Sequence, residues 1–242
     1  MPIFAKLADE LRQLESYLLP GECLLCHGGL GGDPDELVCR LCRARWVRPA
    51  EPLCERCGES RLLPELNCRI CQHWPPGLGK VRSAVWLEAG ARHVVHLLKY
   101  EGWWRVTSAM APAMRGLQPL TGRLFLVPVP LAAKRLRTRG YNQSEHLARA
   151  LSTVIGQPVR PDALHRVRET PTQTALTPEE RLANVAGAFR ATNVRGLRVV
   201  LVDDVFTTGA TLVAAADALT NAGAAEVEAV TFARAKARIG VG

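Results

Sequence analysis

The sequence predicts an α/β protein with a mostly parallel sheet, preceded by a small double zinc ribbon. All eight cysteines lie before residue 72, in four C-x-x-C pairs. After residue 80, apolar strand-like runs alternate with helix-like segments, which is typical of a parallel sheet covered on both faces. The prolines and glycine at Pro75–Gly77 interrupt regular structure between the two parts. We therefore expect a zinc ribbon over residues 21–76 and an α/β domain over residues 80–242.

Residues 1–20 are expected to form a separate amphipathic helix, because four leucines recur there at helical spacing: Leu7, Leu11, Leu14 and Leu18. This segment lacks the basic and apolar regions of a signal peptide, and no apolar run in the chain approaches the ~18 residues of a membrane span. We therefore expect a cytoplasmic protein without a membrane span.

The net charge of +8 is unevenly distributed. Residues 1–76 hold nine Lys/Arg against eleven Asp/Glu, whereas the remainder holds 22 against 12. A polyanionic partner is thus expected to bind the C-terminal part first.

The C-x-x-C pairs predict two structural zinc sites. Each pair places two sulfurs on one turn, within reach of one tetrahedral ion at about 2.3 Å. Disulfides would need an oxidising compartment, and redox chemistry or an iron–sulfur cluster are further alternatives. Pairing in sequence order is the natural arrangement, although spacing leaves an interleaved one open. The expected ligands are Cys23, Cys26, Cys39 and Cys42 for one ion, and Cys54, Cys57, Cys68 and Cys71 for the other.

The α/β domain is predicted to contain four strands and at least three helices. Alternation and apolar runs predict strands over residues 81–88, 123–130, 198–202 and 226–234. Helical patterns cover residues 91–100, 143–155 and 209–222, and a capping box at Thr177–Glu180 indicates a further helix start. In such sheets ligands bind at the carboxyl ends of the strands.

The segment after one of these strands has the chemistry of a sugar-phosphate site. The buried run Val199–Val202 is predicted to end at Asp203 and Asp204. Hydroxyls and N–H groups at the start of the next helix suit a phosphate, and the two carboxylates suit ribose hydroxyls and a divalent cation. This predicts a ribose 5-phosphate bound with Mg²⁺; the phosphate cradle comprises Thr207, Thr208, Gly209, Ala210 and Thr211.

This stretch resembles the phosphoribosyl-pyrophosphate (PRPP) signature of type I phosphoribosyltransferases, although Phe206 is bulkier than the usual aliphatic residue. The chain as a whole resembles the ComF family. The resemblance lies in the order of its parts, which are the cysteine pairs, the blocks Leu97–Gly102, Val127–Ala148 and Thr170–Phe189, and then the PRPP stretch. That family couples a double zinc ribbon to a phosphoribosyltransferase domain and is named for a competence protein associated with DNA uptake. The resemblance implies a type I phosphoribosyltransferase sheet, PRPP bound with Mg²⁺, Asp203 and Asp204 as the catalytic pair, and a role in DNA uptake or DNA processing.

The strand that ends at Pro130 is expected to lead into a loop beside the cradle, and the basic run of this loop is a candidate for binding the pyrophosphate of PRPP. The alternatives are a solvated basic loop and a contact to nucleic-acid phosphates. Asn142 is a helix N-cap candidate, and Arg168–Arg181 resembles the mobile loop that closes over PRPP. The candidate pyrophosphate ligands are Lys99, Lys134, Arg135, Arg137 and Arg139.

Two functions follow from these features. One is a glycosyltransferase that moves the phosphoribosyl group of PRPP to an acceptor that the sequence does not identify. The other is a non-catalytic adaptor that senses PRPP or a nucleotide, while its zinc ribbon binds single-stranded DNA or a DNA-handling helicase. The positive run of the ribbon motivates the second: Arg40, Arg43, Arg45 and Arg48.

Overall fold

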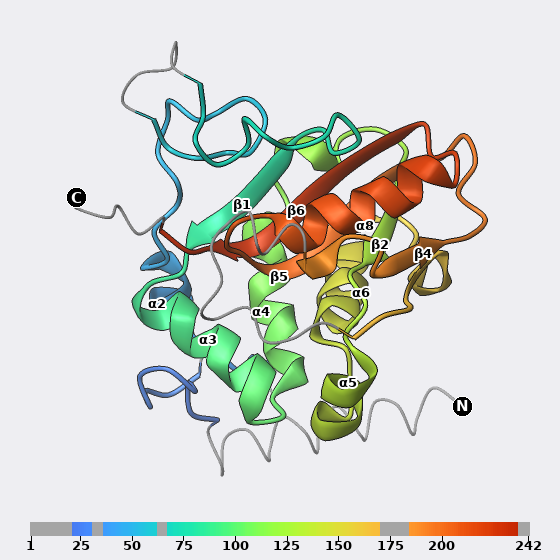
Figure 1. Cartoon of the computed structure of the whole chain (residues 1–242). Helices are drawn as coiled ribbons and strands as arrows, with labels where there is room; N and C mark the ends of the chain where they lie inside the picture. The colour runs from blue at the N-terminus through green and yellow to red at the C-terminus, as the bar shows by residue number, and fades with distance from the viewer. Residues whose placement is uncertain (1–20, 31–35, 62–66, 170–183, 237–242) are drawn as a thin grey trace.

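The C-terminal part is built on one parallel sheet of four strands, in the order β1-β6-β5-β2 (Figure 1). The structure is a computed structural model that describes residues 21–30, 36–61, 67–169 and 184–236. All three pairings in this sheet are parallel, so the predicted α/β class is confirmed. The strands are β1 (Val81–Trp86), β2 (Phe125–Pro128), β5 (Arg198–Phe206) and β6 (Glu226–Arg234).

Helices cover both faces of the sheet, with α3, α4 and α6 on one face and α8 on the other (Figure 1). A small antiparallel pair of strands lies beside α8. The bounds are α2 (Arg40–Ala44), α3 (Ala89–Tyr100), α4 (Thr107–Met114), α5 (Ala133–Arg139), α6 (Gln143–Ile155), α8 (Ala210–Asn221), β3 (Leu164–Arg166) and β4 (Phe189–Ala191). Short 3₁₀ helices occupy Trp104–Val106, Gln118–Leu120 and Pro161–Ala163.

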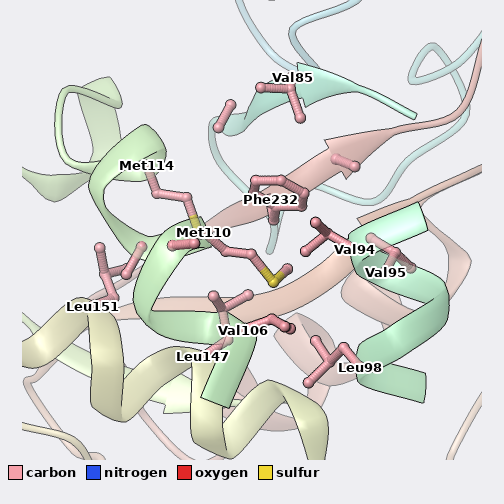
Figure 2. Close-up of a cluster of buried hydrophobic side chains, with 14 of the residues drawn as sticks. Val85, Val94, Val95, Leu98, Val106, Met110, Met114, Leu147, Leu151 and Phe232 are labelled. Carbon is pink, nitrogen blue, oxygen red and sulfur yellow. The ribbon is translucent and has the colours of Figure 1, made fainter. Parts of the chain in front are cut away.

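The larger core lies between the sheet and the three helices on its first face (Figure 2). Met110 and Met114 of α4 lie at its centre and are fully buried, with the ring of Phe232 from β6 against them. Burial of these side chains stabilises the packing of α4 by roughly 1.5–3 kcal/mol per side chain. This helix was missed by the sequence prediction, because it is short and carries Pro112 in its interior.

Helix α6 has the bounds predicted for it. The side chain of Asn142 accepts a hydrogen bond from the Ser144 N–H at 3.1 Å, which confirms the predicted N-cap. Gly156 ends the helix in the left-handed conformation at φ 71°. Local sequence therefore determines both ends of α6.

Two expectations for the domain are wrong. The basic segment after Pro130 forms α5 instead of a loop, and Gly140 closes this helix at φ 81°. Strand β5 does not end at Asp203 and Asp204 but continues to Phe206, because β6 keeps pairing with it through Arg234. The two carboxylates thus belong to the strand.

The cysteine-rich part packs against both faces of the sheet. Cys23, Cys42 and Trp46 join the core formed by α3, α4 and α6, whereas the second cysteine group and Trp74 join the core beneath α8. The predicted division after residue 76 stays a prediction, but Trp74 and Leu78 beside it are buried and do not behave as a free linker. The predicted N-terminal helix, the capping box and most of Arg168–Arg181 lie outside the described residues.

Every helix in the part of the chain that the structure describes is too short or too polar to span a bilayer.

Candidate functional site

The adjacent aspartates of β5 have different partners. Asp203 accepts a hydrogen bond from the buried Ser144 hydroxyl at 2.7 Å. Asp204 is 2% exposed, and its Oδ2 lies 2.7 Å from the Lys99 Nζ. The mutual repulsion of the two carboxylates is thus offset by one hydrogen bond and one ion pair, supplied by α6 and α3.

The ionisation of this cluster depends on burial and on the short distances within it. Burial and the charge of Asp204 raise the pKa of Asp203 to about 7, against the weaker opposing effects of Ser144 and Lys99. Burial opposes the charge of Lys99, but the ion pair with Asp204 outweighs this and raises the pKa of Lys99 above its ordinary value. Asp203 is therefore the group of this cluster that gains or loses a proton near neutral pH.

Stability is expected to fall as the pH rises from about 4 to about 7, because Asp203 keeps in the folded state a proton that it loses in the unfolded chain. Above about pH 7 the carboxyl is ionised in both states, and this contribution no longer changes. Urea unfolding at several pH values measures the slope. Asp203→Asn should remove it, and an unchanged slope in that variant would assign the pH dependence to other groups.

The segment predicted to be a phosphate cradle lies where β5 passes into α8. A small cavity of about 30 Å³ is lined by Asp203 and by the segment from Val205 to Leu212. The Thr208 Oγ1 is buried and has no hydrogen-bond partner among the described residues. The first N–H groups of α8 also have no acceptor within the helix. These donors fit a phosphate group, whereas Asp204 is not among the residues that line this cavity.

A larger cavity of about 930 Å³ is lined by the end of α3 and by one side of α5. Lys99 lines this cavity and also contacts Asp204, so it joins the two parts of the site. Four of the five predicted pyrophosphate ligands line it: Lys99, Lys134, Arg135 and Arg139. The fifth, Arg137, is exposed on α5 and is not among the lining residues.

The eight cysteines form two groups of four, in sequence order. Sulfur atoms within each group lie within 4.8 Å of one another. The Cys26 and Cys39 sulfurs are 3.8 Å apart, and the pairs Cys54/Cys71 and Cys57/Cys68 are each at 3.6 Å. Ligands of a tetrahedral ion with bonds of about 2.3 Å are separated by about 3.8 Å. Both groups therefore fit a zinc ion bound by four thiolates, and the interleaved arrangement is excluded.

One thiol in each group is prepared for metal binding. Burial opposes the ionisation of the Cys23 thiol, but the N–H groups of Cys39 and Leu25 donate to its sulfur and lower its pKa to about 6. Burial likewise opposes the ionisation of Cys54, and N–H donors from Cys57 and Arg56 lower its pKa to about 7. Since the thiolate is the metal ligand, these two thiols favour the binding-competent form. Burial raises the pKa of Cys42, Cys57 and Cys71, so these three thiols lose their protons less readily.

Two residues of the site escaped sequence prediction. Ser144 follows a recognisable N-cap, but only the position of α6 beside β5 brings its hydroxyl to Asp203. Trp74 lies directly behind Gly209, because a Cβ at that glycine would lie 2.9 Å from the indole Cη2. The proximity of Trp74 to Cys71 was the available signal, but it pointed to the zinc site and not to the cradle.

The phosphoribosyl transferase domain family matches residues 136–241. The chain is 35% identical over 221 residues to the DNA utilization protein YhgH of Salmonella typhimurium, which covers 87% of this chain and 95% of that protein. It is 27% identical over 233 residues to the competence protein ComFC of Bacillus subtilis, covering 88% and 94%. It is also 27% identical over 224 residues to competence protein F of Haemophilus influenzae, covering 88% and 96%.

Proposed function

We propose, from the premise that this chain belongs to the ComF family of proteins with a phosphoribosyl transferase domain, that it binds PRPP together with Mg²⁺. The observation that carries the proposal is the juxtaposition at the end of β5. Asp203 lines a cradle in which the Thr208 hydroxyl has no hydrogen-bond partner among the described residues. Lys99, which pairs with Asp204, lines a second cavity together with three further cations.

Each part of PRPP has a matching group. The 5-phosphate suits the donors of Thr207, Thr208 and Thr211 with the N–H groups at the start of α8. The ribose hydroxyls suit Asp203, and the pyrophosphate suits the cavity lined by Lys99 and α5. Asp203 would hold Mg²⁺ together with the bound ligand, because carboxylate and phosphate oxygens are the hard ligands that this ion prefers. In this assignment Asp204 acts through Lys99, which it holds at the mouth of the cavity.

Phosphoribosyl transfer is the reaction for which such a site is suited. An acceptor nucleophile would bond to the anomeric carbon of PRPP while the bond from that carbon to the pyrophosphate oxygen breaks, and pyrophosphate leaves with the electron pair. The cations of the cavity would stabilise the charge that develops on the leaving group. Pyrophosphate release in the presence of candidate bases and nucleotides tests this step.

PRPP with Mg²⁺ is expected to bind to the wild-type protein and to raise its melting temperature. Asp203→Asn should weaken binding by about tenfold or more, because one charge-assisted contact is worth roughly 1.5–3 kcal/mol. Isothermal titration calorimetry measures both proteins, and Asp217→Asn, on the partly exposed side of α8, serves as the matched control. Absence of binding to the wild type, or equal binding by all three proteins, would refute the proposal.

We further propose that both cysteine groups carry structural zinc and that the protein functions in the cytoplasm, where thiols stay reduced. What supports the first part is the sulfur geometry.

The relatives named for DNA utilization and competence support a role for this chain in DNA uptake or processing.

A second candidate function, binding of single-stranded DNA, is favoured by an exposed aromatic rim beside the basic helix. The rim consists of Tyr100, Trp103 and Trp104, which are 71%, 42% and 45% exposed. The Arg139 guanidinium lies 5.8 Å from the centre of the Tyr100 ring. Aromatic faces next to cations suit unpaired bases and their phosphates.

Oligothymidylate is expected to bind to the rim with an affinity that falls as salt rises, because phosphate contacts release counterions. Trp103→Ala should weaken binding by roughly tenfold, in keeping with the value of one stacked base, and Trp103→Phe should retain most of it. Fluorescence anisotropy provides the measurement. Arg137→Ala should weaken DNA binding but not PRPP binding, because Arg137 lies outside the cavity; equal DNA binding by all variants would rule out the rim.

A further inference from the structure

The second cysteine group contacts the strand ends that carry the phosphate cradle. Arg234, the last residue of β6, is 1% exposed and is in register with Phe206, the last residue of β5. Its Nη1 donates to the Cys57 carbonyl at 2.7 Å, and its Nε donates to the Glu59 carboxylate at 2.8 Å. Its Nη2 lies 3.8 Å from the Cys57 sulfur. The guanidinium thus connects the end of the sheet to a proposed zinc ligand and its flanking turn.

A second connection runs through Trp74, three residues after Cys71. The Trp74 N–H donates to the Cys71 carbonyl at 3.1 Å, and the side chain is buried at 5% exposure. Arg56, between two cysteines of the same group, donates to the Trp74 carbonyl at 3.0 Å and lies 5.7 Å from the centre of its ring. The position of the indole is therefore determined by the cysteine-rich segment.

Both connections meet at the residues that begin the cradle. The Phe206 ring has the Arg234 guanidinium 4.1 Å from its centre and the Trp74 ring at 6.0 Å. The indole also occupies the space beside Gly209, which caps α8 at φ 81°. Thr207 and Thr208 lie between these two anchored positions. The orientation of their hydroxyls and N–H groups is therefore expected to depend on the positions of Phe206 and Gly209.

We infer that Trp74 and Arg234 are positioning residues for the phosphate cradle. Zinc binding by the second cysteine group thereby sets the affinity of the cradle for a phosphorylated ligand. The second part rests on the proposed function, because it assumes that the cradle binds such a ligand. The first cysteine group has no equivalent role, since it packs against the core on the opposite face of the sheet. There the ring centres of Trp46 and Phe232 lie 5.0 Å apart.

Two readouts test the inference on the full-length protein. Hydrogen exchange of the peptide from Phe206 to Leu212, without ligand, reports the order of the cradle itself. Calorimetry with PRPP and Mg²⁺ reports its affinity. The variants are Trp74→Ala and Trp74→Phe, which keep all eight cysteines, and Cys68→Ser, with Cys26→Ser as the matched control from the first group.

Trp74→Ala is expected to retain two zinc ions per chain, to speed exchange in this peptide and to weaken PRPP binding by about tenfold, as for other residues that support ligand positions. Trp74→Phe should restore most of both. Cys68→Ser should lose one zinc ion and reproduce the effects of Trp74→Ala, whereas Cys26→Ser should lose one zinc ion and leave the peptide protected.

Unchanged exchange in Trp74→Ala, or equal loss of protection in Cys26→Ser, would overturn the inference. If the wild-type protein does not bind PRPP, the proposed function fails, and the exchange measurements still decide whether the cysteine group holds the cradle. Should Cys68→Ser unfold, the two Trp74 variants decide alone.

Discussion

Lys99→Met is expected to lower the free energy of unfolding by about 3 kcal/mol at pH 8, because it leaves a buried carboxylate without its counter-ion. The Asp204 side chain is 4% exposed and adjoins Asp203, so without the ammonium its charge is shielded from solvent and lies beside a second carboxyl group. The loss should diminish at pH 5, where the orphaned cluster can take up a proton. Urea unfolding at the two pH values measures both effects.

The control for this change is Lys236→Met, which removes the same group from an exposed ion pair with Glu88. Exposed pairs contribute about 1 kcal/mol or less, so this variant should stay near wild type. The double variant Lys99→Met/Asp204→Asn should lose less stability than the two single variants lose together, because the charge that needs a partner has been removed. Equal losses of stability in the two lysine variants would show that the Lys99–Asp204 pair contributes no more than an exposed ion pair does.

Arg234→Met is the second change with a large expected effect, and it should also lower the free energy of unfolding by about 3 kcal/mol. Removal of the fully buried guanidinium leaves both the Glu59 carboxylate and the Cys57 carbonyl without this donor. Methionine fills much of the same volume, so the loss reports the missing hydrogen bonds more than a cavity. Urea unfolding followed by tryptophan fluorescence gives the value.

Arg149→Met provides the comparison, since Arg149 forms an exposed pair with Glu145 one turn away on α6. Such helix pairs contribute about 0.3–0.5 kcal/mol. A loss in Arg234→Met that is as small as in Arg149→Met would contradict the idea that Arg234 joins the cysteine-rich part to the sheet.

The parts of the fold that sequence predicted well are those whose determinants are local. Helix α6 was predicted with both ends because Asn142 and Gly156 are its own caps. Strand β6 likewise has its predicted bounds, because its nine residues form one unbroken strand pattern. Helix α5 was missed because its basic run carries a single large apolar residue, Leu136, and so has no apolar periodicity.

The candidate site was predictable in its members but not in its contacts. The cysteine spacing and the Asp–Asp–Thr–Thr–Gly segment each lie within one short stretch of chain, and the structure brings four of the five candidate pyrophosphate ligands to one cavity. Arg137 was assigned to that set from proximity in sequence, but a helix turns successive side chains to different sides. The extension of β5 through the aspartates depends on β6, which is paired with it only in the folded sheet.

The sequence by itself determined which chemical groups this protein carries: two sets of four cysteines, a pair of aspartates and a segment of hydroxyls and glycine that is a candidate phosphate cradle. Turns, caps and strand ends depend on neighbours in the chain, so these groups are visible in it. Only the tertiary structure decided which groups face one another. Lys99 reaches Asp204, Ser144 reaches Asp203 and Trp74 lies behind Gly209, and each contact joins residues far apart in sequence. Such contacts depend on how the helices pack across the sheet, and no local pattern specifies that arrangement.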